Sequence, residues 1–303
     1  MKSFKINEND AGQRLSRFIE KMFYKVPKSL IYKLIRKKRI KVNFKRSHHD
    51  YILKEEDFVL IYGLDNFLKE KTISFNSEFF KNFKLDVVYE DENIIVINKQ
   101  GGIKTQPNSK TKDSLVDFLV QYLVEKNEYF FEKENSFRPA FCTRLDTNTK
   151  GLVVAGKNKK ALSALNELTL KGNLKKTYIA IVEGNMRKKR EILVGYWSKD
   201  NSKNIVNITA NKRPFSKKVI TEYFVLNQFS DRAKIKIFLY TGKSHQIRAH
   251  MKSISHPIVG DFKYGSKFKE DLKLCCFCIE FKSKGSFLEY LDNKKIALKK
   301  NIF

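Results

Sequence analysis

Apolar residues recur at helical spacing in two stretches near the start of the chain. The first lies in residues 13–23 and the second in residues 28–37, directly after Pro27, a residue suited to the start of a helix. The apolar positions on these faces are Leu15, Phe18, Ile19 and Met22, then Leu30, Ile31, Leu34 and Ile35. Two short apolar strands are expected next, at residues 40–43 and 57–62. The pattern predicts a small domain, residues 1–62, in which two helices pack on a sheet.

The pattern changes after residue 62. Residues 63–83 show weak periodicity and mixed charge, as expected of a linker, and predicted strands dominate the second domain, residues 84–303. We expect strands at residues 85–89, 93–98, 151–155, 177–183, 220–226, 233–240 and 274–281, and helices at residues 114–126, 158–169 and 243–253. Many strands interrupted by a few helices predict an α+β domain rather than a regularly alternating parallel sheet.

The composition predicts a chain that folds around its own hydrophobic core. It has 303 residues, of which 42% are hydrophobic, and this is enough to bury a substantial core. No apolar run reaches the roughly 18 residues of a membrane span, and the first residues have no signal-peptide pattern. Of the four cysteines, three lie in residues 275–278. We therefore expect a cytoplasmic protein with no membrane contact.

Basic residues greatly outnumber acidic ones. The sequence has 61 Lys and Arg against 33 Asp and Glu, a formal charge of +28, which favours a polyanionic partner. Codon supply in an AT-rich genome would also raise the Lys content, so the clustering of the charges matters more. No acidic residue interrupts residues 28–46, and the candidate RNA-binding residues there are Lys28, Lys33, Arg36, Lys37, Lys38, Arg39 and Lys41. The alternative is an ordinary solvated basic helix.

Two segments of the second domain contain candidate catalytic groups. Residues 144–151 read Arg-Leu-Asp-Thr-Asn-Thr-Lys-Gly and run directly into an apolar strand, so this loop could project the Asp146 carboxylate from a rigid sheet. An isolated Asp followed by Thr is otherwise typical of a capped turn. Residues 176–184 form an alternating strand with Tyr178 on one face, which by itself is a common structural pattern.

A third segment, residues 240–265, combines a strand end with a helix. The helix is expected to begin near Ser244, which could cap it, and to place His245 and Arg248 close together on one face. The segment also holds three histidines, His245, His250 and His256. Because no cysteine or acidic ligand pattern accompanies them, we expect no metal site.

Together these segments resemble the RluA family of RNA pseudouridine synthases. The three stretches are similar to the family patterns H-R-L-D-x-x-T-S-G-L, K-x-Y-x-A-x-V-x-G and G-R-x-H-Q-I-R-x-H…H-P-I-x-G-D-x-x-Y-G. The resemblance implies a catalytic domain built on a mixed, largely antiparallel sheet with a central RNA-binding cleft, and it places the catalytic residues at Asp146, Tyr178 and Arg248. Residues 13–62 resemble the ribosomal-protein S-four type of RNA-binding domain.

The sequence departs from these patterns at several positions. In the catalytic segments Thr143 replaces His, Lys150 replaces Ser or Thr, Lys243 replaces Arg, and Cys275-Cys276 replaces a His-Ala pair. In the S-four-like segment Phe44 occupies the place of a Gly. None of these changes removes a predicted catalytic residue. They are expected to alter the packing of the Asp146 loop, its RNA contacts and the N-terminal turn.

The resemblance implies cleavage of the N1–C1′ bond of uridine, rotation of the base and its reattachment through C5, without cofactor or metal. Asp146 either attacks the sugar or assists removal of its 2′ proton, and Arg248 favours its charged form. Because the base must be flipped out of the RNA, Arg144 is expected to fill the gap and Tyr178 to stack on the uracil. We expect further RNA contacts from His245 and Gln246.

The expected partner is RNA, and the chain is expected to be a monomer. A basic domain before such a catalytic domain favours large-subunit ribosomal RNA, with transfer RNA second. Basic segments at residues 187–190 and 212–218 could hold flanking phosphates or could be ordinary solvated loops. The main alternative is an RNA-binding or ribosome-associated protein that has lost turnover. An unrelated nuclease would need acidic metal ligands that we do not find in the sequence.

Overall fold

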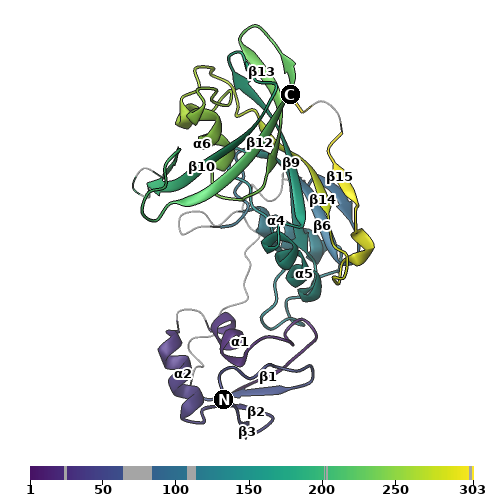
Figure 1. Ribbon diagram of the computed structural model, residues 1–303. Coiled ribbons are helices and arrows are strands. Elements are labelled where there is room, and N and C mark those ends of the chain that lie inside the picture. The colour runs from purple at the N-terminus through teal and green to yellow at the C-terminus, as the bar shows by residue number, and fades with distance from the viewer. Residues whose placement is uncertain (24–25, 64–83, 108–113, 201, 203, 300–301) are drawn as a thin grey trace. The chain divides into compact units, whose positions relative to one another are not determined.

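The computed structural model describes residues 1–23, 26–63, 84–107, 114–200, 202, 204–299 and 302–303. The chain forms two compact units (Figure 1). Unit 1 comprises Met1–Lys84, Asp117–Ala140 and Lys157–Lys160, and unit 2 comprises Leu85–Val116, Phe141–Gly156 and Ala161–Phe303. Almost all of the proposed linker, residues 64–83, lies outside the described residues. No described helix has the length and apolar character needed to cross a bilayer.

Unit 1 contains a four-stranded antiparallel sheet and both predicted N-terminal helices. The strand order is β1-β4-β2-β3. The elements are β1 (Lys2–Lys5), α1 (Leu15–Met22), α2 (Lys28–Arg36), β2 (Ile40–Val42), β3 (Lys45–Arg46) and β4 (Phe58–Ile61). Strand β1 was not predicted, because three of its four residues, Lys2, Ser3 and Lys5, are polar and leave no apolar run.

The apolar faces of the two helices meet in one core. Leu15, Phe18 and Ile19 of α1 are fully buried, and Ile31 and Ile35 of α2 are buried with them. The predicted helical faces are therefore confirmed. The opposite side of α2 is exposed, and this leaves its basic side chains in solvent.

Unit 1 also includes part of the chain that the predicted boundary assigned to the second domain. The buried Asp10 carboxylate accepts hydrogen bonds from the Ser136 backbone N–H (2.9 Å) and hydroxyl (2.5 Å). Asn135 Nδ2 donates to the other Asp10 oxygen at 2.9 Å. Polar side chains at the start of the chain thus hold residues more than a hundred positions away.

The turn between β2 and β3 explains how Phe44 replaces the glycine of the S-four pattern. Asn43 and Phe44 both have positive φ, 50° and 64°, as the two central residues of a type I′ hairpin turn require. Asn43 suits this conformation and uses its side chain, since Oδ1 accepts from Phe58 N–H (2.8 Å) and Nδ2 donates to Asp57 (2.7 Å). Phe44 is 74% exposed, so little packing offsets its strained backbone.

Unit 2 is built on one large mixed sheet, as the resemblance implied (Figure 1). The main order is β11-β10-β12-β13-β9-β14-β8-β6-β5, with β15 beside β14 and β7 beside β8. Along this order, and between β14 and β15, neighbouring strands are antiparallel except β8 with β14. The strands are β5 (Val87–Glu90), β6 (Ile94–Lys99), β7 (Ala140–Phe141), β8 (Lys150–Gly156), β9 (Leu174–Glu183), β10 (Arg190–Asp200), β11 (Ile205–Thr209), β12 (Lys217–Gln228), β13 (Arg232–Leu239), β14 (Leu274–Phe281) and β15 (Lys295–Ala297).

The remaining helices are α4 (Leu115–Glu125), α5 (Lys159–Leu170) and α6 (Gln246–Ser253), with short 3-10 helices η2 (Phe262–Tyr264) and η3 (Glu289–Leu291). Helix α6 packs on β10, β11 and β12 at one end of the sheet (Figure 1). The expected cap of α6 was wrong. His245, rather than Ser244, is the N-cap residue, and it has a left-handed backbone with φ 54°.

The parallel contact between β8 and β14 requires a glycine. Gly151 pairs with Cys276 and has φ 111°, and a Cβ atom built there would lie 2.3 Å from the Cys276 carbonyl oxygen. A side chain at this position would collide with backbone that has nowhere to move. The close approach fixes the end of the Asp146 loop against β14.

The Asn43-Phe44 turn generates a pair of opposite predictions. Phe44→Gly should raise the free energy of unfolding by about 0.5–1 kcal/mol, because glycine adopts positive φ without the steric cost. The matched variant Asn43→Gly should lower it by about 1–2 kcal/mol, because two side-chain hydrogen bonds are lost. Urea unfolding of the full chain measures both, and a destabilised Phe44→Gly variant would contradict the role given to φ.

Candidate active site

The Asp146 side chain lies in the loop between β7 and β8. The loop contains a tight turn in which Asp146 C=O accepts from Thr149 N–H at 3.1 Å. Thr105 holds the preceding residue, since its hydroxyl donates to Leu145 C=O (3.2 Å) and accepts from Leu145 N–H (3.3 Å). The Asp146 side chain is 28% exposed, so it is partly desolvated while one side stays open to a ligand.

Arg248 of α6 contacts two carboxylates at once. Its Nη1 donates to Asp146 Oδ2 at 3.1 Å, while Nε and Nη2 donate to the two oxygens of Asp261 at 2.7 and 2.8 Å. Asp261 is almost fully buried and Arg248 nearly so. Both carboxylates raise the pKa of Arg248, against the opposing effect of burial. The bidentate pair with Asp261 fixes the guanidinium plane, and the third nitrogen is thereby aimed at Asp146.

His245 approaches the same carboxylate from the start of α6. Its Nε2 lies 3.7 Å from Asp146 Oδ2, and its Nδ1 shares a 2.9 Å hydrogen bond with the Tyr264 hydroxyl. The Tyr264 oxygen also accepts from Val206 N–H at 3.0 Å. Burial lowers the pKa of His245, while the negative charge of Asp146 opposes this effect. A neutral imidazole therefore stands beside Asp146 at neutral pH.

Lys99, at the end of β6, connects the loop of residues 100–103 to the loop that carries Asp146. Its side chain is fully buried, and its ammonium donates to three carbonyls, those of Gln100 (2.9 Å), Ile103 (2.9 Å) and Thr147 (2.8 Å). Burial lowers the pKa of Lys99 to about 8, and the charge of Asp146 acts in the opposite direction. The ammonium thus positions the residue next to Asp146 through its carbonyl oxygen.

Tyr178 of β9 is buried in the sheet close to these charges. Its Cα pairs with Cys276 on one side and Ile237 on the other. Burial raises the pKa of Tyr178 well above its usual range, and Asp146 adds to the shift. The phenol is therefore protonated at neutral pH. Cys276, in place of the family alanine, is fully buried beside it.

The predicted RNA-contacting residues of unit 2 have different surroundings. Arg144 is exposed, and no hydrogen bond or ion pair joins it to a described residue. Gln246 is buried, and all four of its hydrogen-bonding positions are used inside the protein. Its amide contacts Thr241 Oγ1 (3.0 Å), Lys243 N–H (3.1 Å), Ile220 C=O (3.1 Å) and Thr221 Oγ1 (3.0 Å).

The predicted RNA-binding residues of unit 1 lie on and after α2. Exposed side chains are Lys28, Lys33, Arg36, Lys37, Lys38 and Arg39, whereas Lys41 is half-buried. Lys28 makes a long ion pair with Glu20 at 3.6 Å, and Lys41 lies over the Tyr62 ring at 5.9 Å. The remaining five cations have no ion pair with any residue that the structure describes.

Two departures from the family pattern are accommodated locally. The Thr143 hydroxyl, in place of a histidine, accepts from Val154 N–H at 3.2 Å and is buried. Lys150 reaches out of the loop to Asp271 at 3.4 Å. Neither side chain contacts the Asp146 carboxylate, so the carboxylate is held by Arg248 and by the loop backbone.

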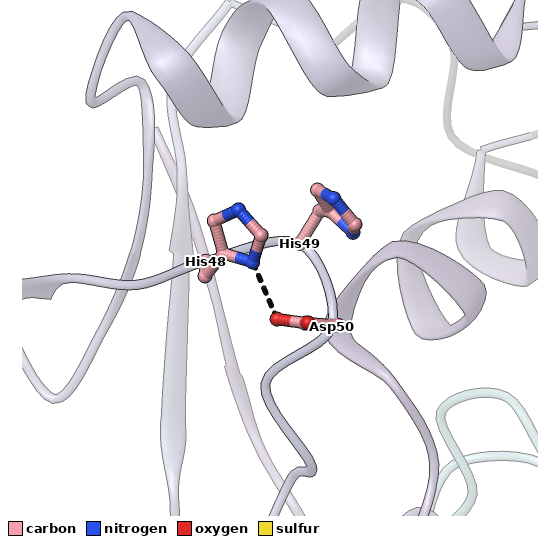
Figure 2. A group of neighbouring side chains, drawn as sticks. All are labelled: His48, His49 and Asp50. Atoms are coloured by element: carbon pink, nitrogen blue, oxygen red, sulfur yellow. Dashed lines mark hydrogen bonds and ion pairs between the residues drawn. The ribbon is translucent and has the colours of Figure 1, made fainter.

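Each of the three histidines in residues 240–265 hydrogen-bonds a different residue. His250 Nδ1 bonds Thr221 Oγ1 (2.7 Å), and His256 Nδ1 bonds Glu183 C=O (2.7 Å). Among the described residues, a group whose ligand atoms lie close enough together to hold a metal ion occurs in unit 1. It consists of His48, His49 and Asp50 (Figure 2). These three are consecutive in one loop, and His48 already hydrogen-bonds Asp50. The group contains no predicted catalytic residue.

Sequence reasoning gave no role to Lys99, Asp261 or Tyr264. Asp261 and Tyr264 lie within the G-D-x-x-Y-G part of the third motif, so the motif itself was a signal for both. Lys99 ends an apolar strand, and a lysine there had no feature that distinguished it from the other cations of this basic chain.

Replacing Lys99 tests its role in the loop. Lys99→Met should lower the free energy of unfolding at pH 7 by about 2–4 kcal/mol, because buried carbonyls lose their donor. The exposed Lys175→Met variant is the control and should change little. Because the folded pKa of Lys99 is lower than the unfolded one, the wild type should gain stability relative to Lys99→Met as pH rises from about 8 to 10.5. Denaturant unfolding at pH 7 and pH 9.5 measures both effects, and equal stability of the two proteins would contradict them.

Comparison with known proteins identifies the family of the chain. Residues 93–253 match the family model described as RNA pseudouridylate synthase. An uncharacterized RNA pseudouridine synthase of Mycoplasma capricolum is 35% identical over 98% of this chain and 97% of its own. The ribosomal large subunit pseudouridine synthase C of Vibrio parahaemolyticus is 28% identical over 86% of this chain and 79% of its own.

The fold has solved counterparts. The human RNA pseudouridylate synthase domain containing 1 protein has a TM-score of 0.55 at 20% identity, covering 72% of this chain and 91% of that one. The mixed α+β fold is thus that of a pseudouridylate synthase domain. This chain belongs to the RNA pseudouridylate synthase family, and it is an isomerase that acts on RNA.

Proposed function

We propose that this enzyme converts uridines of large-subunit ribosomal RNA to pseudouridine, with Asp146 as its catalytic carboxylate. The observation that carries the proposal is the 3.1 Å contact that holds Asp146 against Arg248 at the start of α6. Support for the substrate comes from relatives in Vibrio and Buchnera, 28–31% identical, that are named ribosomal large subunit pseudouridine synthase C. Transfer RNA is the second candidate.

Arg248 orients the Asp146 carboxylate and balances its charge. Because Arg248 already forms a bidentate pair with Asp261, it cannot swing away when Asp146 moves toward a ribose. Asp146 uses Oδ2 for this contact, and no hydrogen bond or ion pair with a described residue occupies its other oxygen. That oxygen is the one we assign to the substrate sugar, either as the attacking atom or as the acceptor of the 2′ proton.

His245 supports the same carboxylate. The Tyr264 hydroxyl accepts from Val206 N–H, so its own proton is available for His245 Nδ1. This arrangement leaves the proton of the neutral imidazole on Nε2, facing Asp146. We propose that His245 positions Asp146 and lines the RNA-binding side of the site.

We assign Tyr178 to contact with the flipped uracil. Arg144 fills the gap that the flipped nucleotide leaves in the RNA stack. As a neutral phenol, Tyr178 offers an aromatic face for the uracil and a hydroxyl that can guide the proton leaving C5, but it is not a base. Arg144 is exposed and two residues before Asp146, and its free planar guanidinium suits insertion into the RNA stack.

Gln246 receives a different role from the one expected. With all four hydrogen-bonding positions occupied inside the protein, its side chain has none left for RNA. We propose that it fixes residues 241–243 relative to β12, and so sets where His245 stands.

Unit 1 is the proposed docking surface. We assign its basic residues to RNA phosphates, as in the S-four type of domain that its sequence resembles. The support is that five exposed cations following Lys28 have no acidic partner among the described residues, so their charge is available to a polyanion.

Asp146→Asn tests the catalytic assignment. The purified wild type should form pseudouridine in ribosomal RNA transcripts without added cofactor and in the presence of EDTA. Asp146→Asn should lose more than about a hundredfold of this turnover, equivalent to about 3 kcal/mol in the barrier, and should still bind the RNA. The exposed Asp231→Asn is the control and should turn over normally.

Cells that lack the gene extend this test to the natural substrate. Pseudouridine mapping after complementation with wild type or Asp146→Asn should reveal sites in large-subunit ribosomal RNA that only the wild type restores. Restored sites confined to transfer RNA would contradict the substrate assignment. Turnover by Asp146→Asn near the wild-type level would mean that the carboxylate is not catalytic.

A charge-removal variant tests the docking surface. In the triple variant Lys33→Gln, Arg36→Gln, Lys37→Gln, the slope of log Kd against log salt concentration should fall by roughly 2–3. Each phosphate contact that is lost means that about one counterion fewer is released on binding. Turnover at saturating RNA should remain. The control variant removes three exposed charges elsewhere, Lys282, Lys284 and Lys295. An equal change in both slopes would mean that the cations of α2 are not a specific RNA contact.

A further inference from the structure

The loop between β11 and β12 holds a phenylalanine in a conformation that favours glycine. Ser216 N–H donates to Arg213 C=O at 3.1 Å, with Pro214 and Phe215 as the two central residues of the turn. Phe215 has φ 60°. Proline followed by a residue of positive φ is the arrangement of a type II turn, whose third position normally carries glycine.

No packing or ring contact within the described part of the chain compensates for this strain. Phe215 is 100% exposed, and no ring contact joins it to a described residue. The turn itself is firmly closed, because the Ser216 hydroxyl donates to Arg213 C=O (2.6 Å) and accepts from Arg213 N–H (2.9 Å). The backbone therefore presents the aromatic ring outward on a rigid support. A strained residue with no internal function indicates a contact outside the chain.

The charge around the ring identifies the partner. Four cations flank Phe215, and residues 201–221 contain no acidic residue. None of the four has an ion pair within the described part of the chain. They are Lys212, Arg213, Lys217 and Lys218. An aromatic ring among free cations is the combination that binds single-stranded nucleic acid, in which phosphates meet the charges and bases stack on the ring.

The base of the loop is connected to the active site. Lys217 pairs across the sheet with Trp197 of β10, and the Trp197 indole N–H donates to Ser244 C=O at 3.0 Å. Ser244 precedes His245, whose ring lies 3.7 Å from Asp146. On the other side of the loop, Val206 of β11 packs with Tyr264. The loop thus rises from the same framework that positions the catalytic carboxylate.

We propose that Phe215 stacks on an unpaired base of the substrate RNA that flanks the target uridine. The proposal rests on the proposed function, since it assigns a base contact to that same substrate. Stacking on an aromatic ring tolerates any base, so this contact adds affinity and holds the RNA in register without reading its sequence.

Three substitutions at Phe215 separate stacking from other roles. Phe215→Leu and Phe215→Gly should raise the KM and Kd for substrate RNA by about five- to a hundredfold, the range of one lost base–aromatic stack, with kcat unchanged. Phe215→Trp should restore both within about twofold. Phe215→Gly should also unfold at the wild-type temperature or above, because glycine suits φ 60°. The control is Phe287→Leu, an exposed phenylalanine outside the loop, which should bind RNA normally.

RNA with single abasic positions identifies the stacked nucleotide. At one position beside the target, removing the base should weaken RNA binding by the wild type but not by Phe215→Leu. The loss of affinity caused by the abasic position and the loss caused by the substitution are then not additive. If losses are additive at every position, or if Phe215→Leu binds RNA like the wild type, the proposal is wrong. A change in sedimentation with unchanged RNA affinity would also overturn it, in favour of self-association. A wild type that forms no pseudouridine would instead contradict the proposed function itself.

Discussion

The site depends on one arginine held between two carboxylates. Two nitrogens of Arg248, Nε and Nη2, donate to Asp261, which is almost fully buried. The third nitrogen, Nη1, donates to Asp146, which is partly exposed. A buried carboxylate left without its cation would be costly, so the pair with Asp261 is the one that the fold must keep. Asp146 is the weaker and more exposed partner. Its contact with Arg248 can therefore adjust to a ligand without loosening α6.

The loop that carries Asp146 is restrained mainly by its backbone. Lys99 holds Thr147 C=O, Thr105 holds both polar groups of Leu145, and Gly151 lets the next strand touch β14. Each restraint acts within a few residues of the carboxylate, yet none uses the carboxylate itself. The loop therefore keeps its shape whatever the charge or contacts of Asp146 during a reaction. This separation also explains how Thr143 and Lys150 can differ from the family pattern without contacting the Asp146 carboxylate.

Sequence reasoning recovered the parts of the structure that follow from local patterns. The helical faces of α1 and α2 and the class of the large sheet were predicted correctly. In helices and strands alike, the spacing of apolar residues along the sequence indicates which side chains are buried. Strands β10 and β11 were missed, since charged residues flank the apolar run of β10, most of its residues are partly exposed, and β11 is only five residues long. The pairing of Arg248 with Asp146, expected from the family resemblance, is present. Lys99 was beyond reach because its acceptors are carbonyl oxygens, which leave no trace in a sequence. The left-handed backbone of His245 and Phe215 was equally hidden, since most histidines and nearly all phenylalanines have negative φ.

The sequence separation of Asp146, Arg248 and Asp261 has a consequence for biosynthesis. Arg248 follows Asp146 by 102 positions and Asp261 comes 13 positions later still. At about 5–20 residues per second on the ribosome, the arginine emerges many seconds after the carboxylate. The cations of residues 28–46 are made long before either. A nascent chain can thus carry its exposed positive charge near ribosomal RNA while the Asp146 carboxylate still lacks its guanidinium partner. The contacts that join Asp146, Arg248 and Asp261 therefore form only after residue 261 has been made.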